Sequence, residues 1–381
     1  MNDSSTKTKI EFKMCTKCIL DNNDDKFITF DDQGVCNYCH QYEALMSNIP
    51  PLEKRLEELN HILMQIKKDG KGKKFDVILG LSGGVDSSFL AYLCKKYELR
   101  TLVVHLDNGW NSDTAVKNIY NLVNQFGFEL VTHVIDWEEF KDLQLAYLKA
   151  SVIDIEAITD HAIMALLYKM AAKYKIKYIL SGANYTGEAL MIKNWVWKKS
   201  DWLNIKSIHQ KFGQKKLKTF PHISFWEKLL YHNFYKIKII PLLNYIDYNP
   251  IEAKKILTDQ VGWMDYGTKH GESVFTRFYQ NYILIRKFNV DKRKLHLSNL
   301  IWSGKISRDE ALQIIQKKLY TDQELAFEKE YVLKKLGLSN DEFEHIMNLP
   351  IRSHQEFDSD ERLYKIYFKL IKTIKKLILK N

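Results

Sequence analysis

Short apolar runs alternate along the chain with stretches in which apolar residues recur every three or four positions. The runs predict buried strands at 75–80, 100–107, 129–136 and 176–182. The periodic stretches predict helices at 52–67, 87–97, 114–126 and 157–174. This alternation is typical of an α/β fold, in which helices cover both faces of a parallel sheet. Ligands bind beyond the carboxyl ends of such strands, so we expect the loops that follow them to form one crevice.

The pattern becomes helical beyond Asp247. A hydroxyl residue precedes a glutamate by three positions at Ser307, Thr321 and Ser339, and each pair predicts a capping box at the start of a helix. Residues 365–379 predict a basic amphipathic helix. We therefore divide the chain into a cysteine-rich module at 1–50, a helical linker at 51–74, an α/β domain at 75–265 with an insertion at 191–240, and a helical region at 266–381.

The composition is that of an ordinary globular protein, with 45% hydrophobic and 27% charged residues among 381. No apolar run reaches the ~18 residues that a membrane span needs. The N-terminus is polar and has no secretory signal, so we expect a cytoplasmic protein. The net charge of +10 is concentrated in residues 191–240, which hold eleven lysines, one aspartate, one glutamate and half of the eight tryptophans. Such a segment can bind nucleic acid, an anionic lipid surface or an anionic substrate.

Residues 78–90, ILGLSGGVDSSFL, predict a phosphate-binding loop between a strand and a helix. The Gly-Gly turn and the start of the helix direct backbone N–H groups toward an anion, and three serines add hydroxyl donors. Asp86 would repel an anion unless a divalent cation lay between them, so it points to Mg²⁺. The lysine of a Walker A loop is absent. The predicted phosphate-binding residues are Ser82, Gly83, Gly84, Asp86, Ser87 and Ser88. The alternative is a plain strand–turn–helix with a serine cap.

Other polar residues follow the predicted strands. Gly182, Asn184 and Glu188 lie at and after the end of the fourth strand and can reach a nucleotide or a reacting carbonyl, unless they form an ordinary polar loop. Asp160 and His161 open the long helix at 157–174. They can serve in proton transfer, or as a helix cap beside a packed histidine.

The cysteines form two CxxC pairs, Cys15 with Cys18 and Cys36 with Cys39, separated by seventeen residues. Because cytosolic thiols stay reduced, this spacing predicts one tetrahedral, closed and structural Zn²⁺ site, with an Fe–S cluster as the lesser alternative. Only Cys94 remains, in the middle of a predicted helix, which disfavours a reaction that transfers sulfur.

The six residues from Ser82 to Ser87 resemble the SGGxDS signature of the PP-loop ATP pyrophosphatases, which have the adenine nucleotide alpha hydrolase-like fold. Members of that superfamily cleave ATP between the α- and β-phosphates and attach AMP to a carbonyl oxygen, and a nucleophile then displaces AMP. The resemblance implies that the loop holds pyrophosphate, that Asp86 and Ser87 serve in catalysis, and that the loop at Asp107 lies near the adenosine. It also accounts for the absent lysine.

Residues 266–312 carry a dense polar set, from which we predict a substrate-binding group. Its members are Lys269, His270, Glu272, Arg277, Lys292 and Arg293. The two arginines and Lys292 can clamp a carboxylate or a diphosphate. The alternative is an exposed pair of salt-bridged helices.

Together, the CxxC module, the SGG loop and residues 266–312 resemble the N-acetyl sugar amidotransferases of O-antigen and of pseudaminic and legionaminic acid biosynthesis. The resemblance implies that ATP activates a sugar acetamido group, whose oxygen ammonia replaces to give an acetamidino group. It also implies Mg²⁺, a structural Zn²⁺, and ammonia from separate glutaminase and cyclase-like channelling subunits. Which sugar is used stays open.

Two alternatives remain. A PP-loop tRNA-modifying enzyme would use the same loop and zinc site and would bind RNA through the tryptophans of 191–240, whereas our first interpretation includes no nucleic-acid partner. A non-catalytic nucleotide-binding scaffold would leave Asp86 without a role.

Overall fold

The computed structural model describes residues 11–267 and 271–378, and the side chains as far as 373. Its centre is a parallel sheet in the order β3-β2-β1-β4-β5. The strands are β1 (Val77–Gly80), β2 (Thr101–Asp107), β3 (Glu129–Val134), β4 (Tyr178–Leu180) and β5 (Lys238–Ile240). The predicted α/β class and the four predicted strands are confirmed. The sequence does not predict β5, which lies within the predicted insertion at 191–240.

Helices cover both faces of the sheet, as predicted. Alternate residues of β1 and β2 enter two separate cores. One core includes α2 (Leu52–Gly70), α3 (Val85–Lys96), α4 (Asp113–Phe126) and α10 (Pro250–Val261). The other includes α5 (Trp137–Ala150), α6 (Ala157–Lys173) and α8 (Trp202–Phe212). The sheet is thus buried on both sides, which explains why its strands appear as continuous apolar runs.

The remaining helices lie before the first strand, between β4 and β5, or after the last strand. They are α1 (Asn37–Met46), α7 (Tyr185–Glu188), α9 (Phe225–Asn233), α11 (Val274–Phe278), α12 (Leu284–Phe288), α13 (Lys292–Trp302), α14 (Arg308–Ile315), α15 (Asp322–Leu336), α16 (Asn340–Asn348) and α17 (Glu361–Ile378). Short turns are η1 (Lys193–Trp195), η2 (Leu242–Tyr245), η4 (His354–Glu356) and a π-helical turn, η3 (Tyr279–Ile283). The three predicted capping boxes are present at Ser307, Thr321 and Ser339. Among the described helices, none has the length and apolar character to cross a membrane.

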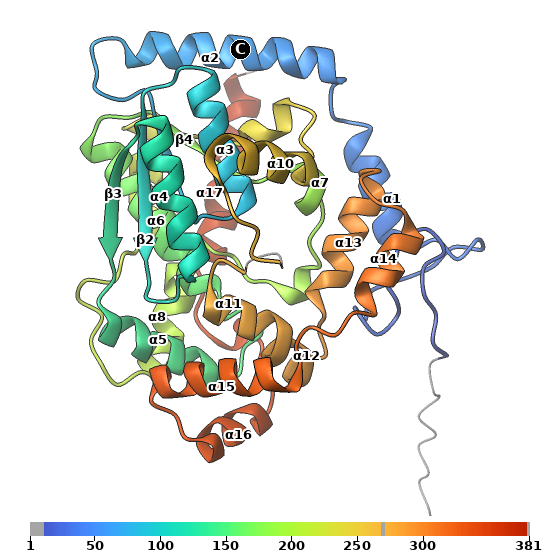
Figure 1. Ribbon diagram of the computed structural model, residues 1–381. Coiled ribbons are helices and arrows are strands. Elements are labelled where there is room, and N and C mark those ends of the chain that lie inside the picture. Colours follow the sequence, from blue (N-terminus) through green and yellow to red (C-terminus); the bar gives the residue numbers. More distant parts are fainter. Residues whose placement is uncertain (1–10, 268–270, 379–381) are drawn as a thin grey trace, which may run out of the picture.

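The helical C-terminal region begins at the carboxyl end of the sheet. Ser112 N–H donates to the carbonyl of Glu272 over 2.8 Å, and Val274 N–H donates to the carbonyl of Trp110 over 2.8 Å. Figure 1 shows α11, α12, α15 and α16 beyond the tips of β2 and β3, and α1 beside α13 and α14. The C-terminal helices therefore close one side of the crevice that the parallel sheet creates.

Candidate active site

The SGG loop connects β1 to α3, and its backbone requires glycine. Gly83 has φ +83°, in the left-handed region, and a Cβ there would lie 2.7 Å from the Ala115 carbonyl oxygen. The Trp263 indole N–H donates to the Gly83 carbonyl over 3.0 Å and fixes the turn from outside. A side chain at position 83 would therefore both strain the backbone and displace α4.

Two serines and Asp86 extend this loop into the crevice. The Ser82 and Ser87 hydroxyls lie 3.2 Å apart, and the Gly84 N–H donates to Ser82 Oγ over 3.2 Å. Asp86 Oδ1 accepts a hydrogen bond of 2.5 Å from the Tyr248 hydroxyl and one of 3.4 Å from Asn184 Nδ2. Burial and the Asp86 carboxylate raise the pKa of Tyr248 far above its usual range, so its hydroxyl remains a donor. Tyr248 was not predicted, because no local motif surrounds it.

A cavity of about 260 Å³, here called the loop cavity, opens above the SGG loop. It joins the predicted loop residues to the predicted residues after β4, to the predicted Glu272 and to residues that were not predicted, among them Tyr248, Tyr266 and His296. The lining includes Ser82, Gly84, Asp86, Ser87, Gly182, Asn184, Glu188, Glu272, Tyr248, Tyr266 and His296. Hard divalent cations prefer oxygen ligands, so carboxylates beside phosphate donors suit a Mg²⁺-bound phosphate.

A second cavity, here called the strand-end cavity, occupies about 310 Å³ between α6 and the carboxyl ends of β1, β2 and β4. Its walls are largely apolar, with polar groups from Asn108, Asn111, Glu156 and Asp160. The Glu156 carboxylate is buried and accepts a hydrogen bond of 2.9 Å from Thr276 Oγ1. Burial, reinforced by the charge of Asp160, raises the pKa of Glu156 to about 7. An apolar pocket with a few polar groups is the usual form of a small-molecule site.

A third cavity, here called the helical cavity, occupies about 230 Å³ between α7, η1, η3, α13 and α14. Its polar lining residues include Glu188, Gln280, Asn281, Lys292, His296 and Asn299, and Trp195 forms part of its wall. Burial lowers the pKa of Lys292, although the carboxylates of Asp154 and Glu156 oppose this effect.

The three cavities adjoin one another through shared residues. The strand-end and loop cavities share Ser82, Gly182 and Glu272, and the loop and helical cavities share Gly187, Glu188 and His296. The SGG loop therefore lies between a pocket at the strand ends and a pocket made by the C-terminal helices.

Several predicted site residues lie elsewhere. His161 is fully buried, its two ring nitrogens bond to the Lys199 carbonyl and the Ile223 N–H over 2.8 and 3.2 Å, and burial lowers its pKa to about 4. The predicted proton-transfer role thus finds no support in its position. Ser88 is buried one position further around α3, and its side chain lines none of the three cavities.

The predicted anion clamp is not assembled either. Arg277 donates to Glu328 over 2.8 Å and lines none of the three cavities, and Arg293 lines the helical cavity but pairs with Asp291 over 2.6 Å. The sequence did not reveal these pairs, and of the three predicted cations only Lys292 combines a place in a cavity wall with a site among buried acids.

Three further residues predicted for the site are Asp107, Lys269 and His270. The Asp107 carboxylate accepts a hydrogen bond of 2.9 Å from the Gly109 N–H and lines none of the three cavities. The next residue, Asn108, lines the strand-end cavity. Lys269 and His270 lie outside the described residues.

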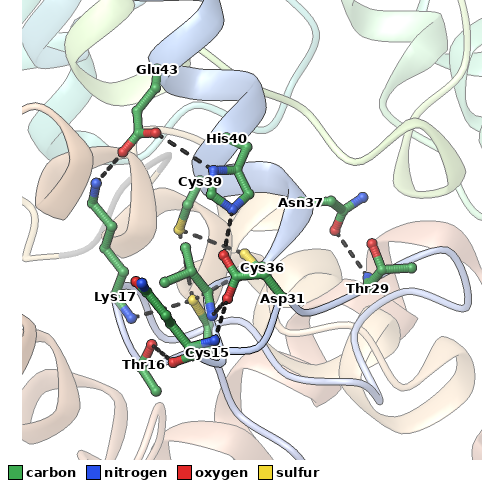
Figure 2. Close-up of polar contacts among 12 residues, drawn as sticks. Cys15, Thr16, Lys17, Thr29, Asp31, Cys36, Asn37, Cys39, His40 and Glu43 are labelled. Atoms are coloured by element: carbon green, nitrogen blue, oxygen red, sulfur yellow. Dashed lines mark hydrogen bonds and ion pairs between the residues drawn. The ribbon is translucent and has the colours of Figure 1, made fainter.

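The four predicted cysteines converge on one point. Their Sγ atoms are within 4.8 Å of one another, with separations of 3.7 Å for Cys15–Cys39 and for Cys18–Cys36. A tetrahedral site with Zn–S bonds of ~2.3 Å places its sulfurs ~3.8 Å apart, so the cluster fits zinc. Figure 2 shows Cys15, Cys36 and Cys39 pointing toward one another. Three backbone N–H groups, from Lys17, Cys18 and Cys36, donate to Cys15 Sγ over 3.2–3.4 Å, as expected around a metal-bound thiolate.

The cysteine cluster supports the wall of the helical cavity. Trp302, at the end of α13, donates its indole N–H to Cys39 Sγ over 3.1 Å, and Arg308 donates to the carbonyls of Cys15 and Cys18. The Trp195 indole N–H donates to the Asp24 carbonyl over 2.9 Å. The N-terminal module therefore holds both α13 and η1, which line that cavity.

Comparisons with known proteins give separate matches for the sheet domain and for the C-terminal helices. The family "NAD synthase" matches residues 56–191, and the family "LPS biosynthesis protein WbpG-like, C-terminal domain" matches residues 272–375. An uncharacterized protein of Methanocaldococcus jannaschii is 31% identical over 119 residues, which are 31% of this chain and 41% of that relative. The tRNA(Ile)-lysidine synthase of Chlamydia pneumoniae is 39% identical over 70 residues, 18% of this chain and 22% of that relative. The chain thus matches less than half the length of either curated relative.

Two solved structures are similar to the chain at low identity. The NH3-dependent NAD synthetase of Campylobacter jejuni has a TM-score of 0.32 at 16% identity, and the alignment covers 76% of this chain and 98% of the synthetase chain. The NMN synthetase of Francisella tularensis has a TM-score of 0.32 at 14% identity, and the alignment covers 80% of this chain and 98% of the synthetase chain. The sheet domain, which carries the SGG loop, is thus similar to the NAD synthase family, and the C-terminal helices are similar to the C-terminal domain of WbpG-like LPS biosynthesis proteins.

Proposed function

We propose that the protein is an ATP-dependent amidotransferase that converts an acetamido group of a bacterial surface sugar into an acetamidino group. The observation that carries this proposal is the position of the SGG loop between two adjoining cavities. ATP would place its nucleoside in the strand-end cavity and its phosphates at the loop, and the sugar would enter the helical cavity from the WbpG-like region. The α-phosphate and the acetamido oxygen then meet at the loop cavity.

The chain's own residues suit this arrangement. The loop N–H groups and the Ser82 and Ser87 hydroxyls bind the β- and γ-phosphates, which leave as pyrophosphate. Asp86, Glu188 and Glu272 offer carboxylate oxygens to Mg²⁺, which neutralises phosphate charge when bound. Tyr248 orients Asp86 through their hydrogen bond, and Lys292 offers a cation to the acid or phosphate group of the sugar.

Two displacements complete the reaction. The amide oxygen attacks the α-phosphorus, the bond to the β-phosphate oxygen breaks, pyrophosphate departs, and the amide nitrogen releases its proton to give an adenylated imidate. Ammonia then attacks the carbon of the adenylated imidate, the C–O bond breaks, AMP departs, and the nitrogen releases a proton to give the amidine. We propose that ammonia comes from separate glutaminase and channelling subunits, since the four clustered cysteines suit metal and Cys94 is buried within α3.

The tRNA-modifying alternative is less well supported. It requires tryptophans of 191–240 to stack on RNA bases. Trp195 is buried with its N–H on the Asp24 carbonyl, Trp197 donates to Asp201 over 3.1 Å, and Trp202 stacks on His222 with ring centres 4.3 Å apart. Only Trp226 of these four is exposed.

The decisive experiment supplies the purified protein with ATP, Mg²⁺ and ammonium, and with one acceptor at a time. The acceptors are a nucleotide-linked diacetamido uronic acid, a diacetamido nonulosonic acid and bulk tRNA. We expect AMP and pyrophosphate in equal amounts, and an acetamidino product by mass spectrometry, with one of the sugars. AMP release that depends on tRNA alone would overturn the proposal, and glutamine used as well as ammonium by the protein alone would overturn the partner subunits.

A further inference from the structure

Helix α9 has two apolar faces, one of which nothing in the described structure covers. Its inner face includes Phe225, which is buried. Its outer face carries Trp226, Leu230 and, just beyond the helix, Phe234, which are 67%, 49% and 74% exposed. These residues are four positions apart, so they form one stripe along the helix. Large apolar side chains gathered on a surface are typical of an interaction site.

Helix α17 lies beside α9 and extends this surface. The Phe225 ring packs edge-on against the rings of Tyr364 and Tyr367, with centroids 4.7 and 5.9 Å away. Tyr364 and Tyr367 mark the side of α17 that faces the protein. Elsewhere on the same helix Ile366 and Leu370, four positions apart, are exposed, and Phe368 is exposed beside the two tyrosine rings against which it packs. In Figure 1, α17 runs behind the sheet domain.

The same two segments are strongly basic. Residues 224–238 and 361–373 contain seven cations: Lys228, Lys236, Lys238, Arg362, Lys365, Lys369 and Lys372. Their two acidic residues are already engaged. Glu227 forms a capping box with Ser224, and Glu361 pairs with Lys198 and Lys365 over 3.1 and 3.2 Å. The surface therefore combines apolar side chains with an excess of positive charge.

We propose that α9 and α17 form a docking surface for an anionic lipid bilayer, with the lysines on the headgroup phosphates and the apolar side chains among the upper acyl carbons. A bilayer surface satisfies both kinds of side chain at once. Nucleic acid would engage the lysines and aromatic rings but not Leu230, Ile366 or Leu370. A second copy of the chain would bring two positive surfaces together. The proposal does not depend on the proposed reaction.

Vesicle co-sedimentation of the full chain tests this proposal. The probes are vesicles of phosphatidylcholine alone and vesicles in which about a third of the lipid is phosphatidylglycerol. We expect binding to the anionic vesicles only, and we expect added salt to weaken it, because salt screens exposed charges. The double variant Trp226→Ser/Phe234→Ser should bind at least tenfold more weakly. The control is Phe327→Ser, since Phe327 is 75% exposed on α15 and should not matter.

A second variant separates charge from apolar contact. Lys369→Glu/Lys372→Glu should abolish binding to anionic vesicles, and thermal unfolding should match the wild type, because both side chains are exposed. Failure of the wild type to bind anionic vesicles would overturn the proposal. Equal loss in Phe327→Ser would also overturn it, as would variants that lose tRNA binding or self-association while vesicle binding persists.

Discussion

The SGG loop and the helical cavity are built in opposite ways. The loop takes the groups that line its cavity from one short stretch, residues 82–87, between a strand and a helix. The helical cavity takes its wall from α7, η1, η3, α13 and α14, which are spread over more than a hundred residues. A local motif can therefore specify the first, whereas only the whole fold specifies the second. The difference fits our proposal that the loop carries the ATP chemistry and the helices select the acceptor.

The largest expected effect tests the loop. Asp86→Asn keeps the shape of the side chain and an acceptor for the Tyr248 hydroxyl but removes the charge for Mg²⁺. We expect AMP and pyrophosphate formation to fall by about a thousandfold, as for the loss of a metal ligand at a phosphoryl site. The matched control is Ser88→Ala on the same helix, which should retain most activity because Ser88 lines none of the three cavities. Equal losses in both variants would mean that the whole helix start, and not Asp86, is required.

The second effect concerns Glu156, at the strand-end cavity on the other side of the SGG loop from the helical cavity. Its carboxyl lines the strand-end cavity and accepts from Thr276, which belongs to the C-terminal region. The pKa of Glu156 is raised from 4.5 to about 7, so the folded protein binds the proton of this carboxyl group more tightly than the unfolded chain does. The stability that this proton provides is complete below about pH 4.5 and is lost as pH rises through 7.

Glu156→Gln is always neutral and should remove this dependence. The difference in unfolding free energy between the variant and the wild type should grow in favour of the variant between pH 4.5 and 7, by roughly 3 kcal/mol at most. Urea titrations across this range measure it. A difference that stays constant with pH would show that the Glu156 pKa is not raised.

The parts of the site that the sequence predicted are those with local determinants. The SGG turn requires glycine through its own backbone, and each pair of cysteines is set by its own CxxC spacing. Strand β5 was missed because it has only three residues, and because Lys236 and Lys238 interrupt the isoleucines of this segment, which leaves no long apolar run. Tyr248 was missed because it reaches Asp86 from 162 positions further along the chain.

The wrongly placed residues fail for a related reason. The sequence placed His161 near the start of a helix but did not indicate which way its ring faces, and the ring faces the core. Arg277 was predicted to bind substrate, yet its partner Glu328 lies 51 positions away. Charged residues close together in sequence therefore do not establish a ligand site unless the fold leaves them unneutralised.

The third effect tests the helical cavity. Lys292→Met keeps the length of the side chain and removes its charge. We expect the KM for the sugar to rise at least tenfold, because a buried cation beside an anion contributes more than a surface pair, and the KM for ATP to change little. The control is Lys329→Met, since Lys329 pairs with Glu344 over 3.0 Å and lines none of the three cavities. A rise in the KM for ATP instead would place Lys292 on the nucleotide side.

The smallest expected effect concerns the support behind that cavity. Trp302→Phe removes the N–H that bonds to Cys39 Sγ and keeps a ring against Tyr42, whose centre lies 5.5 Å away. Because hydrogen bonds to a metal-bound thiolate stabilise it, we expect zinc release to a chromogenic chelator to become several-fold faster. Tyr42→Phe, which keeps both the ring and the N–H, should leave zinc release unchanged. Trp302 ends the helix that carries Lys292, so the same variant should raise the KM for the sugar more than the KM for ATP. A larger rise in the KM for ATP would show that the cysteine cluster does not support the wall of the helical cavity.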